Sequence, residues 1–273
     1  RTAQEAETQM SALSKPIGND EKNAVTEDIK GAVNCALKDK IKEEIKKEYR
    51  YRIETHSHTK PVSPCSFLPP ERLIEIYKEN GYDALAVTNH FSMLLCRDRS
   101  KEEYCKAYID DFKRAKAEGE KLGVEVILGA EVRFPDTAND YLVYGIEEKD
   151  IYEIFDLLVL DYKSFSEKFR KDGRLFLQAH PFRDGMTQID YSYVDGIESF
   201  NMHVNHNSRV AAGAKLVASK PGFIGLCGSD AHEEASCCGG GIYTRVLPHN
   251  SHELAEIIRQ DDFLFSIADK LVL

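Results

Sequence analysis

Histidine and carboxylate side chains recur along this sequence, each at the end of a short apolar segment. The first group is His56 and His58, which are separated by one residue. The same spacing returns near the C-terminus in Asp230 and His232. Side chains two apart on a β-strand project from the same face, so each pair can place both donors on one metal ion. One such pair is weak evidence, but packing does not readily explain two pairs at opposite ends of a series of strands.

Three further donors end apolar segments between these pairs, namely His90, Glu131 and His180. A carboxylate at the end of an apolar strand is costly to bury unless it is paired or coordinated. Glu131 is therefore either a carboxylate that bridges two metal ions, the partner of a salt bridge to Arg133, or a residue at an exposed strand end. His90 and His180 taken singly would suit structural roles. Together with the other donors they complete a mixed imidazole and carboxylate set, which suits zinc, manganese or iron better than calcium.

The elements that must position these donors are short apolar strands that alternate with helices from residue 52 onward. This alternation predicts an α/β fold built from parallel βα units. Strands are predicted at 52–56, 84–88, 124–132, 141–146, 175–179, 196–200, 222–228 and 242–247, and helices at 70–80, 98–122, 148–159, 164–172, 205–219 and 251–260. Seven or eight units in roughly 220 residues favour a distorted β/α barrel over an open sheet, with its chemistry at the C-terminal ends of the strands.

An N-terminal extension, residues 1–49, precedes this predicted barrel domain of residues 50–273. Its first part is polar and is expected to be partly disordered. Residues 26–49 carry apolar side chains four apart on an otherwise charged sequence, which predicts an amphipathic helix. This helix is expected either to pack against the main domain or to mediate oligomerisation.

The composition is that of an ordinary soluble enzyme, with 42% hydrophobic and 30% charged residues in 273. A net charge of −10 argues against nucleic acid as the default partner, since binding to its phosphates favours a basic surface. No apolar segment approaches the roughly 18 residues of a membrane span, so no membrane contact is predicted. The seven cysteines form no CxxC pair or disulfide framework, which indicates reduced thiols and a cytoplasmic location.

The order of the motifs THSH, TNH, GAE, HP and SDAH resembles the PHP family, named for its polymerase-associated and histidinol-phosphatase members. The resemblance covers roughly residues 52–247. It implies a distorted (β/α)7 barrel with two or three divalent metal ions (zinc, manganese or iron) and phosphoesterase activity. Carried over by position, it implies a first metal position formed by His56, His58, Glu131 and Asp230, a second that involves Glu131 and His180, and a third that involves His90 and His232.

Two positions depart from the family pattern. The family often has Asp or His shortly after the first motif. In this chain Cys65 is the only soft donor in that stretch, and it is either a metal ligand or a small buried residue near a turn. The family also often has His at the start of the strand after the glutamate. Asp140 stands there, and a carboxylate can replace imidazole as a ligand. Arg183, just after His180, is expected either to bind the substrate phosphate with a bidentate fork or to be a surface arginine.

The predicted reaction is hydrolysis of a phosphate monoester of a small metabolite or nucleotide by metal-activated water. Glu131, Asp230 and Arg183 are the predicted catalytic residues, and histidinol phosphate is one specific candidate substrate. The sequence contains neither a GxSxG nucleophile motif nor a P-loop. A nuclease that acts on nucleic-acid ends could use the same metal centre. A non-catalytic barrel with only a structural or regulatory metal is the third hypothesis.

Overall fold

The computed structural model describes residues 38–268 and 270–272. The chain divides into two compact units, residues 1–47 and 48–273. Residues 38–48 are helical, and the remainder of the helix predicted over 26–49 lies largely outside the described residues. Within the part of the chain that is described, no helix is long and apolar enough to cross a bilayer.

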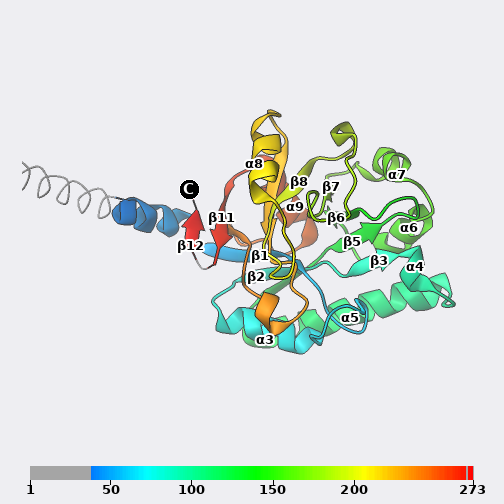
Figure 1. Ribbon diagram of the computed structural model, residues 1–273. Coiled ribbons are helices and arrows are strands. Elements are labelled where there is room, and N and C mark those ends of the chain that lie inside the picture. The colour runs from blue at the N-terminus through cyan, green and yellow to red at the C-terminus, as the bar shows by residue number, and fades with distance from the viewer. Residues whose placement is uncertain (1–37, 269, 273) are drawn as a thin grey trace, which may run out of the picture. The chain divides into compact units, whose positions relative to one another are not determined.

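The second unit mixes strands and helices, as Figure 1 shows. The strands are β1 (Tyr51–Ser57), β2 (Ala84–Val87), β3 (His90–Ser92), β4 (Glu125–Leu128), β5 (Ala130–Arg133), β6 (Asp140–Tyr144), β7 (Leu175–Gln178), β8 (Gly196–Asn201), β9 (Ile224–Gly228), β10 (Ile242–Thr244), β11 (Phe263–Ile267) and β12 (Lys270–Val272). The helices are α3 (Pro70–Glu79), α4 (Met93–Cys96), α5 (Lys101–Leu122), α6 (Asp150–Leu157), α7 (Tyr162–Phe169), α8 (Val210–Ala218) and α9 (Ser251–Gln260), with short 3-10 turns at Tyr191–Tyr193 and Glu234–Ser236.

The strands form two six-stranded sheets, in the orders β12-β11-β10-β1-β2-β4 and β3-β5-β6-β7-β8-β9. Strands β1, β2 and β4 are parallel, and so are β7, β8 and β9. Strand β6 runs antiparallel to both of its neighbours, and β10, β11 and β12 are antiparallel strands at one edge of the first sheet. The α/β class is therefore confirmed, but this pairing does not confirm the closed barrel, and the series of parallel units is interrupted at β6.

The two sheets approach each other where the parallel strands end. The single strand predicted over 124–132 is divided at Gly129 into β4 and β5, which belong to different sheets. A side chain at Gly129 would meet Thr88 Cγ2 at 2.8 Å, so the close passage requires glycine. On the other side, Ser57 and Ala231 form an isolated parallel bridge between the end of β1 and the segment after β9.

Two apolar clusters support this arrangement. An outer cluster lies mainly beneath α3, α5, α6 and α7, and an inner cluster joins strand residues of both sheets to α9 through Leu254 and Ile258. Helix α9 closes the end at which the parallel strands begin, because Ser251 Oγ accepts a hydrogen bond from Gly145 N and His249 contacts Glu125 at the start of β4. The opposite end is therefore left for polar side chains.

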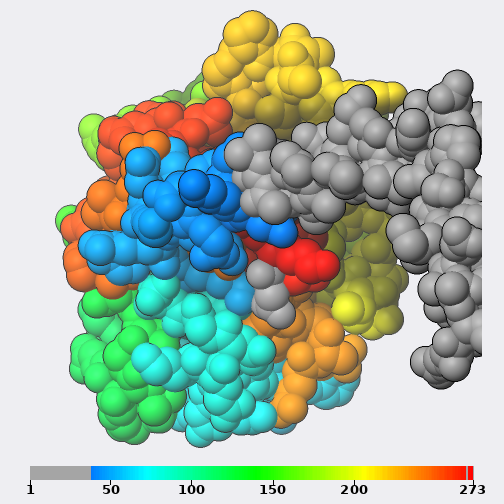
Figure 2. All heavy atoms as spheres, turned by 90° about the vertical axis from the view of Figure 1, so that its left-hand side faces the viewer, coloured from blue at the N-terminus to red at the C-terminus, as the bar shows by residue number. Residues whose placement is uncertain are grey.

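The helices α5 and α8 differ in how they meet the sheets. Helix α5 begins with a capping box between Ser100 and Glu103 and ends at Gly123 in the left-handed conformation, as its sequence favours. Helix α8 contacts β8 closely at Gly213, where a side chain would meet Ser199 O at 2.8 Å. Its other side chains are not buried, and it stands out from the surface in Figures 1 and 2.

Candidate metal centre

The strand ends bring the predicted donors together at the end opposite α9. Strand register places His90 of β3 directly beside Glu131 of β5. The bridge between Ser57 and Ala231 brings the segments of the two spaced pairs into contact. The predicted donors that are buried here are His56, His58, Glu131, Asp140, His180 and Asp230, whereas His90 and His232 are partly exposed and Cys65 is exposed.

The donors predicted for the first metal position lie close together. His56 Nε2 lies 3.0 Å from His58 Nε2, 3.4 Å from Glu131 Oε1 and 3.5 Å from Asp230 Oδ1. His58 Nε2 lies 3.5 Å from Glu131 Oε2 and 3.2 Å from Asp230 Oδ1. Four donors about 2 Å from a central ion in a tetrahedron are about 3.3 Å apart, so these separations fit a bound divalent ion.

Glu131 connects this position to the second one. Its Oε1 is 2.9 Å from His180 Nε2, and its Oε2 is 2.7 Å from His90 Nδ1 without an aligned hydrogen bond. A buried carboxylate oxygen that lacks a hydrogen-bond partner requires an explanation, and coordination of a metal ion by Glu131 would provide one. Arg133, the alternative partner considered for Glu131, instead forms an ion pair with Asp140.

The third position gathers three imidazoles and a thiol. The His58 ring stacks on those of His90 and His232, with centroids 4.4 and 4.3 Å away. Partial desolvation raises the pKa of the Cys65 thiol, but hydrogen bonds to His232 and His90 outweigh it and lower that pKa to about 6. Cys65 is exposed, so it is not the small buried residue considered as an alternative to a ligand. A thiolate beside two imidazoles is a donor set suited to zinc.

Glu198 orients the ligands from behind. Its Oε1 lies 2.9 Å from His56 Nδ1, which leaves Nε2 of that ring directed at the first position. Its Oε2 accepts hydrogen bonds from the backbone N–H of His180 and from Asn201 Nδ2. A carboxylate that accepts a hydrogen bond from the non-coordinating ring nitrogen of a histidine fixes the orientation of the ring and increases the basicity of the coordinating nitrogen.

Glu54 is a positioning residue that the sequence analysis did not identify. Its Oε1 accepts hydrogen bonds of 2.9 Å from the backbone N–H groups of Thr55, His56 and Ser229, and Tyr77 donates to Oε2 at 2.7 Å. This one buried carboxylate therefore holds the first motif against the last. The sequence signal was a glutamate inside an apolar strand directly before the histidine pair.

Two of the predicted ligands have unusual backbone conformations. His180 has a φ of 28° and Asp230 a φ of 54°, both in the region that side chains with a Cβ rarely adopt. Such conformations persist where the surrounding structure imposes them, and they are concentrated at functional sites. The chain thus turns each donor inward at the end of its strand.

The electrostatics of the site follow from this crowding. Burial by itself lowers the pKa of His56, but Glu198, Asp230 and Glu131 outweigh it and hold that pKa well above its usual value. Burial and repulsion from His232 and His90 hold the pKa of His58 well below its usual value. Burial also raises the pKa of Asp230, but neighbouring imidazoles outweigh it and keep this group ionised.

Metal affinity is expected to rise with pH between about 6 and 8. His56 is cationic at neutral pH without metal and must release a proton to become a ligand, so binding releases protons and tightens by about tenfold per pH unit for each proton. Below about pH 6 the Cys65 thiolate is protonated as well. Competition with a chromogenic chelator measures the affinity, and zinc affinity that does not vary over this range would contradict the expectation.

Cavities lead from the surface to this cluster. One of about 330 Å³ is lined by cationic and imidazole groups, including Arg133, Arg183 and His206, together with Asp230. Arg183 is 18% exposed, and its guanidinium lies 4.0 Å from Asp230 Oδ2 and 3.7 Å from Asp140 Oδ2. The predicted phosphate-binding arginine therefore faces the metal cluster and is not a surface arginine.

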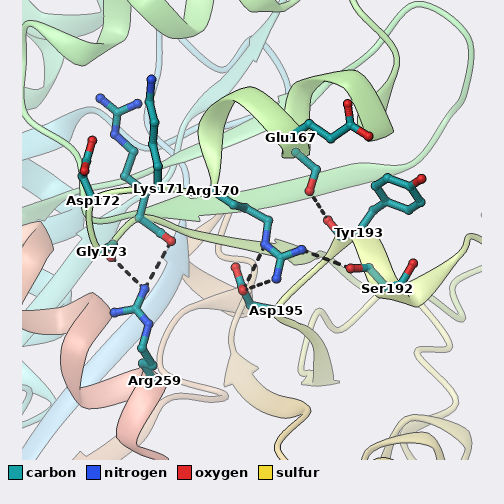
Figure 3. Close-up of a pocket in the computed structure, with 11 residues that line it drawn as sticks. Glu167, Arg170, Lys171, Asp172, Gly173, Ser192, Tyr193, Asp195 and Arg259 are labelled. Atoms are coloured by element: carbon teal, nitrogen blue, oxygen red, sulfur yellow. Dashed lines mark hydrogen bonds and ion pairs between the residues drawn. The ribbon is translucent and has the colours of Figure 1, made fainter.

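A larger cavity of about 590 Å³, shown in Figure 3, shares no lining residue with the cluster. Arg170 donates to Asp195 and to Ser192 O, and Arg259 donates to Gly173 O. These arginines are engaged in connecting loops to one another at the end where β7 begins. The arrangement is a structural network, and the donors able to hold a metal lie in the other cavities.

A curated relative and two solved structures resemble this chain. DNA polymerase III PolC-type from Clostridium perfringens (strain 13 / Type A) is 24% identical over 153 residues, which is 53% of this chain and 10% of that protein. The chain thus spans about a tenth of the relative's length. PsfC from Pseudomonas syringae PB-5123 matches with a TM-score of 0.48 and 18% identity over 77% of this chain and 98% of that chain.

The other structure is a two-domain protein from Bacteroides vulgatus ATCC 8482, described as containing a predicted PHP-like metal-dependent phosphoesterase. It has a TM-score of 0.59 and 16% identity, and the match covers 81% of this chain and 66% of that chain, just under two thirds of its length. At this identity the likeness shows a shared fold. The family model described as "PHP domain" matches residues 54–266, a range that begins just before the first histidine pair and includes every donor described above. This match confirms the resemblance seen in the motifs, and the chain belongs to the PHP domain family.

Proposed function

We propose that the protein is a metal-dependent phosphoesterase that hydrolyses the phosphate monoester of a small metabolite or nucleotide through metal-activated water. The observation that carries this proposal is the close set of His56, His58, Glu131 and Asp230 donors beside an opening that contains Arg183. Family membership and the fold shared with the Bacteroides protein support it. A distorted (β/α)7 barrel, the finer fold assignment, is supported by the continuity of β4 with β5 and by the bridge between Ser57 and Ala231.

The donors of the site fit two or three divalent ions of zinc, manganese or iron, because they combine imidazole, carboxylate and thiolate groups. Glu131 would hold an ion at the first or the second position, and Cys65 with His90 and His232 would hold one at the third. Such ions supply a lowered pKa of bound water and neutralise charge on the phosphate. A cytoplasmic location and oligomerisation through the N-terminal helix remain proposals.

Protein side chains are positioned to bind the substrate phosphate and to accept a proton from the attacking water. Arg183 lies between the carboxylates of Asp230 and Asp140 at salt-bridge range but without a close hydrogen bond to either, so its guanidinium can bind an incoming phosphate oxygen. Asp230 Oδ1 faces the imidazoles, and Oδ2 accepts a hydrogen bond from Asn201 Nδ2 and faces Arg183 at the opening. Asp230 Oδ2 is therefore the atom positioned to accept a proton from the attacking water.

The surroundings of the opening favour a small ester over a nucleic acid. A cavity of about 310 Å³ continues from His90 and Glu131 along Phe91 and Leu94, and Leu94 is 75% exposed. An apolar wall beside the metal donors suits a leaving group with apolar surface. Together with the net charge of −10, it disfavours a long polyanion. The partial match to a DNA polymerase supports the alternative, a nuclease that acts on nucleic-acid ends.

The metal-loaded protein is expected to hydrolyse an aryl phosphate such as p-nitrophenyl phosphate when manganese or zinc is supplied. Arg183→Met should raise KM by about 10-fold or more while bound metal is unchanged, because a charge-assisted phosphate contact contributes about 1.5–3 kcal/mol. Arg259→Met is the matched control, since Arg259 pairs with Glu256 on α9, at the opposite end of the domain. Inactivity of the loaded protein toward small esters, with release of nucleotides from oligonucleotide ends, would replace this proposal with the nuclease.

A further inference from the structure

Asp140, whose Oδ2 lies 3.8 Å from His180 Nε2 at the second metal position, is paired with a guanidinium group. Arg133 and Asp140 are directly opposite each other in the antiparallel pair β5–β6. Arg133 Nε donates to Asp140 Oδ1 and Nη2 donates to Oδ2, both at 2.6 Å. Both oxygens of this fully buried carboxylate are thus occupied by one bidentate fork. The strand register makes the pair, so it does not depend on a flexible loop.

The other cationic contacts of the site differ from this one in chemistry. An imidazolium beside Glu131 or Asp230 can lose its proton and then becomes a neutral metal ligand. A guanidinium does not deprotonate in proteins and offers no lone pair. A divalent ion that used Asp140 would therefore have to displace Arg133 or lie against its full positive charge. Arg183, 3.7 Å from Asp140 Oδ2, adds a second positive charge on the same side.

The remaining donors at this position are few. Without Asp140, it retains His180 and Glu131, and Glu131 Oε1 also faces the first position, 3.4 Å from His56 Nε2. The other group that Asp140 could complete, with His90 and Glu131, loses the same carboxylate. The first position keeps the four donors predicted for it. The third position keeps the Cys65 thiolate and the imidazoles of His90 and His232. The guanidinium supplies, beside Asp140, the positive charge that a metal ion would otherwise supply.

We propose that Arg133 takes the place of a metal ion at the second position, so that the protein binds two divalent ions, at the first and third positions. The inference rests on the metal centre of the proposed function. It concerns the number of ions bound and is independent of which ester is hydrolysed.

Counting zinc tests it directly. Full-length protein is stripped with a chelator, reloaded with excess zinc and separated from loose metal by gel filtration, and zinc per chain is measured by plasma mass spectrometry. We expect two ions in the wild type and three in Arg133→Met, because this substitution frees Asp140. The double variant with Asp140→Asn should return to two. Arg183→Met is the matched control and should stay at two, since Arg183 makes no bidentate contact with Asp140.

Three ions in the wild type, or two in a folded Arg133→Met, would overturn the proposal. If Arg133→Met does not fold, Asp140→Asn alone decides: a count unchanged from the wild type supports the proposal, and a loss of one ion overturns it. Hydrolysis is measured separately on the same samples. Two bound ions without ester hydrolysis would reject the proposed function and leave this inference standing, whereas no bound zinc would reject both.

Discussion

Replacing Asp230 with asparagine is expected to lower kcat/KM for phosphate-monoester hydrolysis by about 10³-fold or more, as a metal-assisted reaction loses a charged ligand and proton acceptor. Asp230 Oδ1 lies within 3.5 Å of both His56 Nε2 and His58 Nε2, and an amide there cannot neutralise the charge of a bound ion. Asparagine keeps the size of the side chain. It also tolerates the φ of 54° at this position, so the loss would report on charge and not on backbone conformation.

Asp261→Asn is a closely matched control. Asp261 also has a φ of 54°, but it ends α9, at the end of the domain opposite the metal donors. The two variants therefore share the substitution and the backbone conformation and differ in location. For both variants, steady-state kinetics would be measured at saturating manganese. The zinc content per chain would be measured separately. Wild-type activity in Asp230→Asn would remove Asp230 from the catalytic residues and with it the proposed mechanism.

The donors could be predicted from sequence because their signals are local. A histidine pair two apart, or a charged residue directly after an apolar strand, needs only strand periodicity and the rule that chemistry gathers at strand ends. Helices with clear caps were predicted equally well. The helix predicted over 251–260 spans Ser251–Gln260, where Asn250 caps its first turn.

The features that sequence reasoning missed depend on non-local pairing. Arg133 was considered a partner of Glu131, its neighbour two positions along the strand, but the register of β5 with β6 places it opposite Asp140. The division of the predicted strand 124–132 at Gly129 depends on Thr88, which lies far away in sequence. The role of Glu54 likewise depends on Ser229, at the other end of the domain.

Removing the metal ions is expected to lower the melting temperature by about 10 °C. A ligand at about 1,000 times its dissociation constant stabilises the native state by about 4 kcal/mol, and 1 kcal/mol shifts the melting temperature of a chain of this size by about 2–4 °C. The donors that lose an ion are buried, and Glu131 Oε2 lacks even a hydrogen bond to replace it. Calorimetry of the zinc-loaded protein before and after exhaustive chelation measures the shift.

The expected shift is limited because the metal-free cluster keeps internal ion pairs. His56 stays beside Glu198, and His180 stays hydrogen-bonded to Glu131, so the strand ends are not left with unpaired charges alone. Asp230→Asn should already bind metal weakly, and chelation should therefore move its melting temperature less than that of Asp261→Asn. Equal shifts in the two variants would mean that the stabilising ion binds elsewhere, and no shift in either would mean that the fold does not depend on the first position being filled.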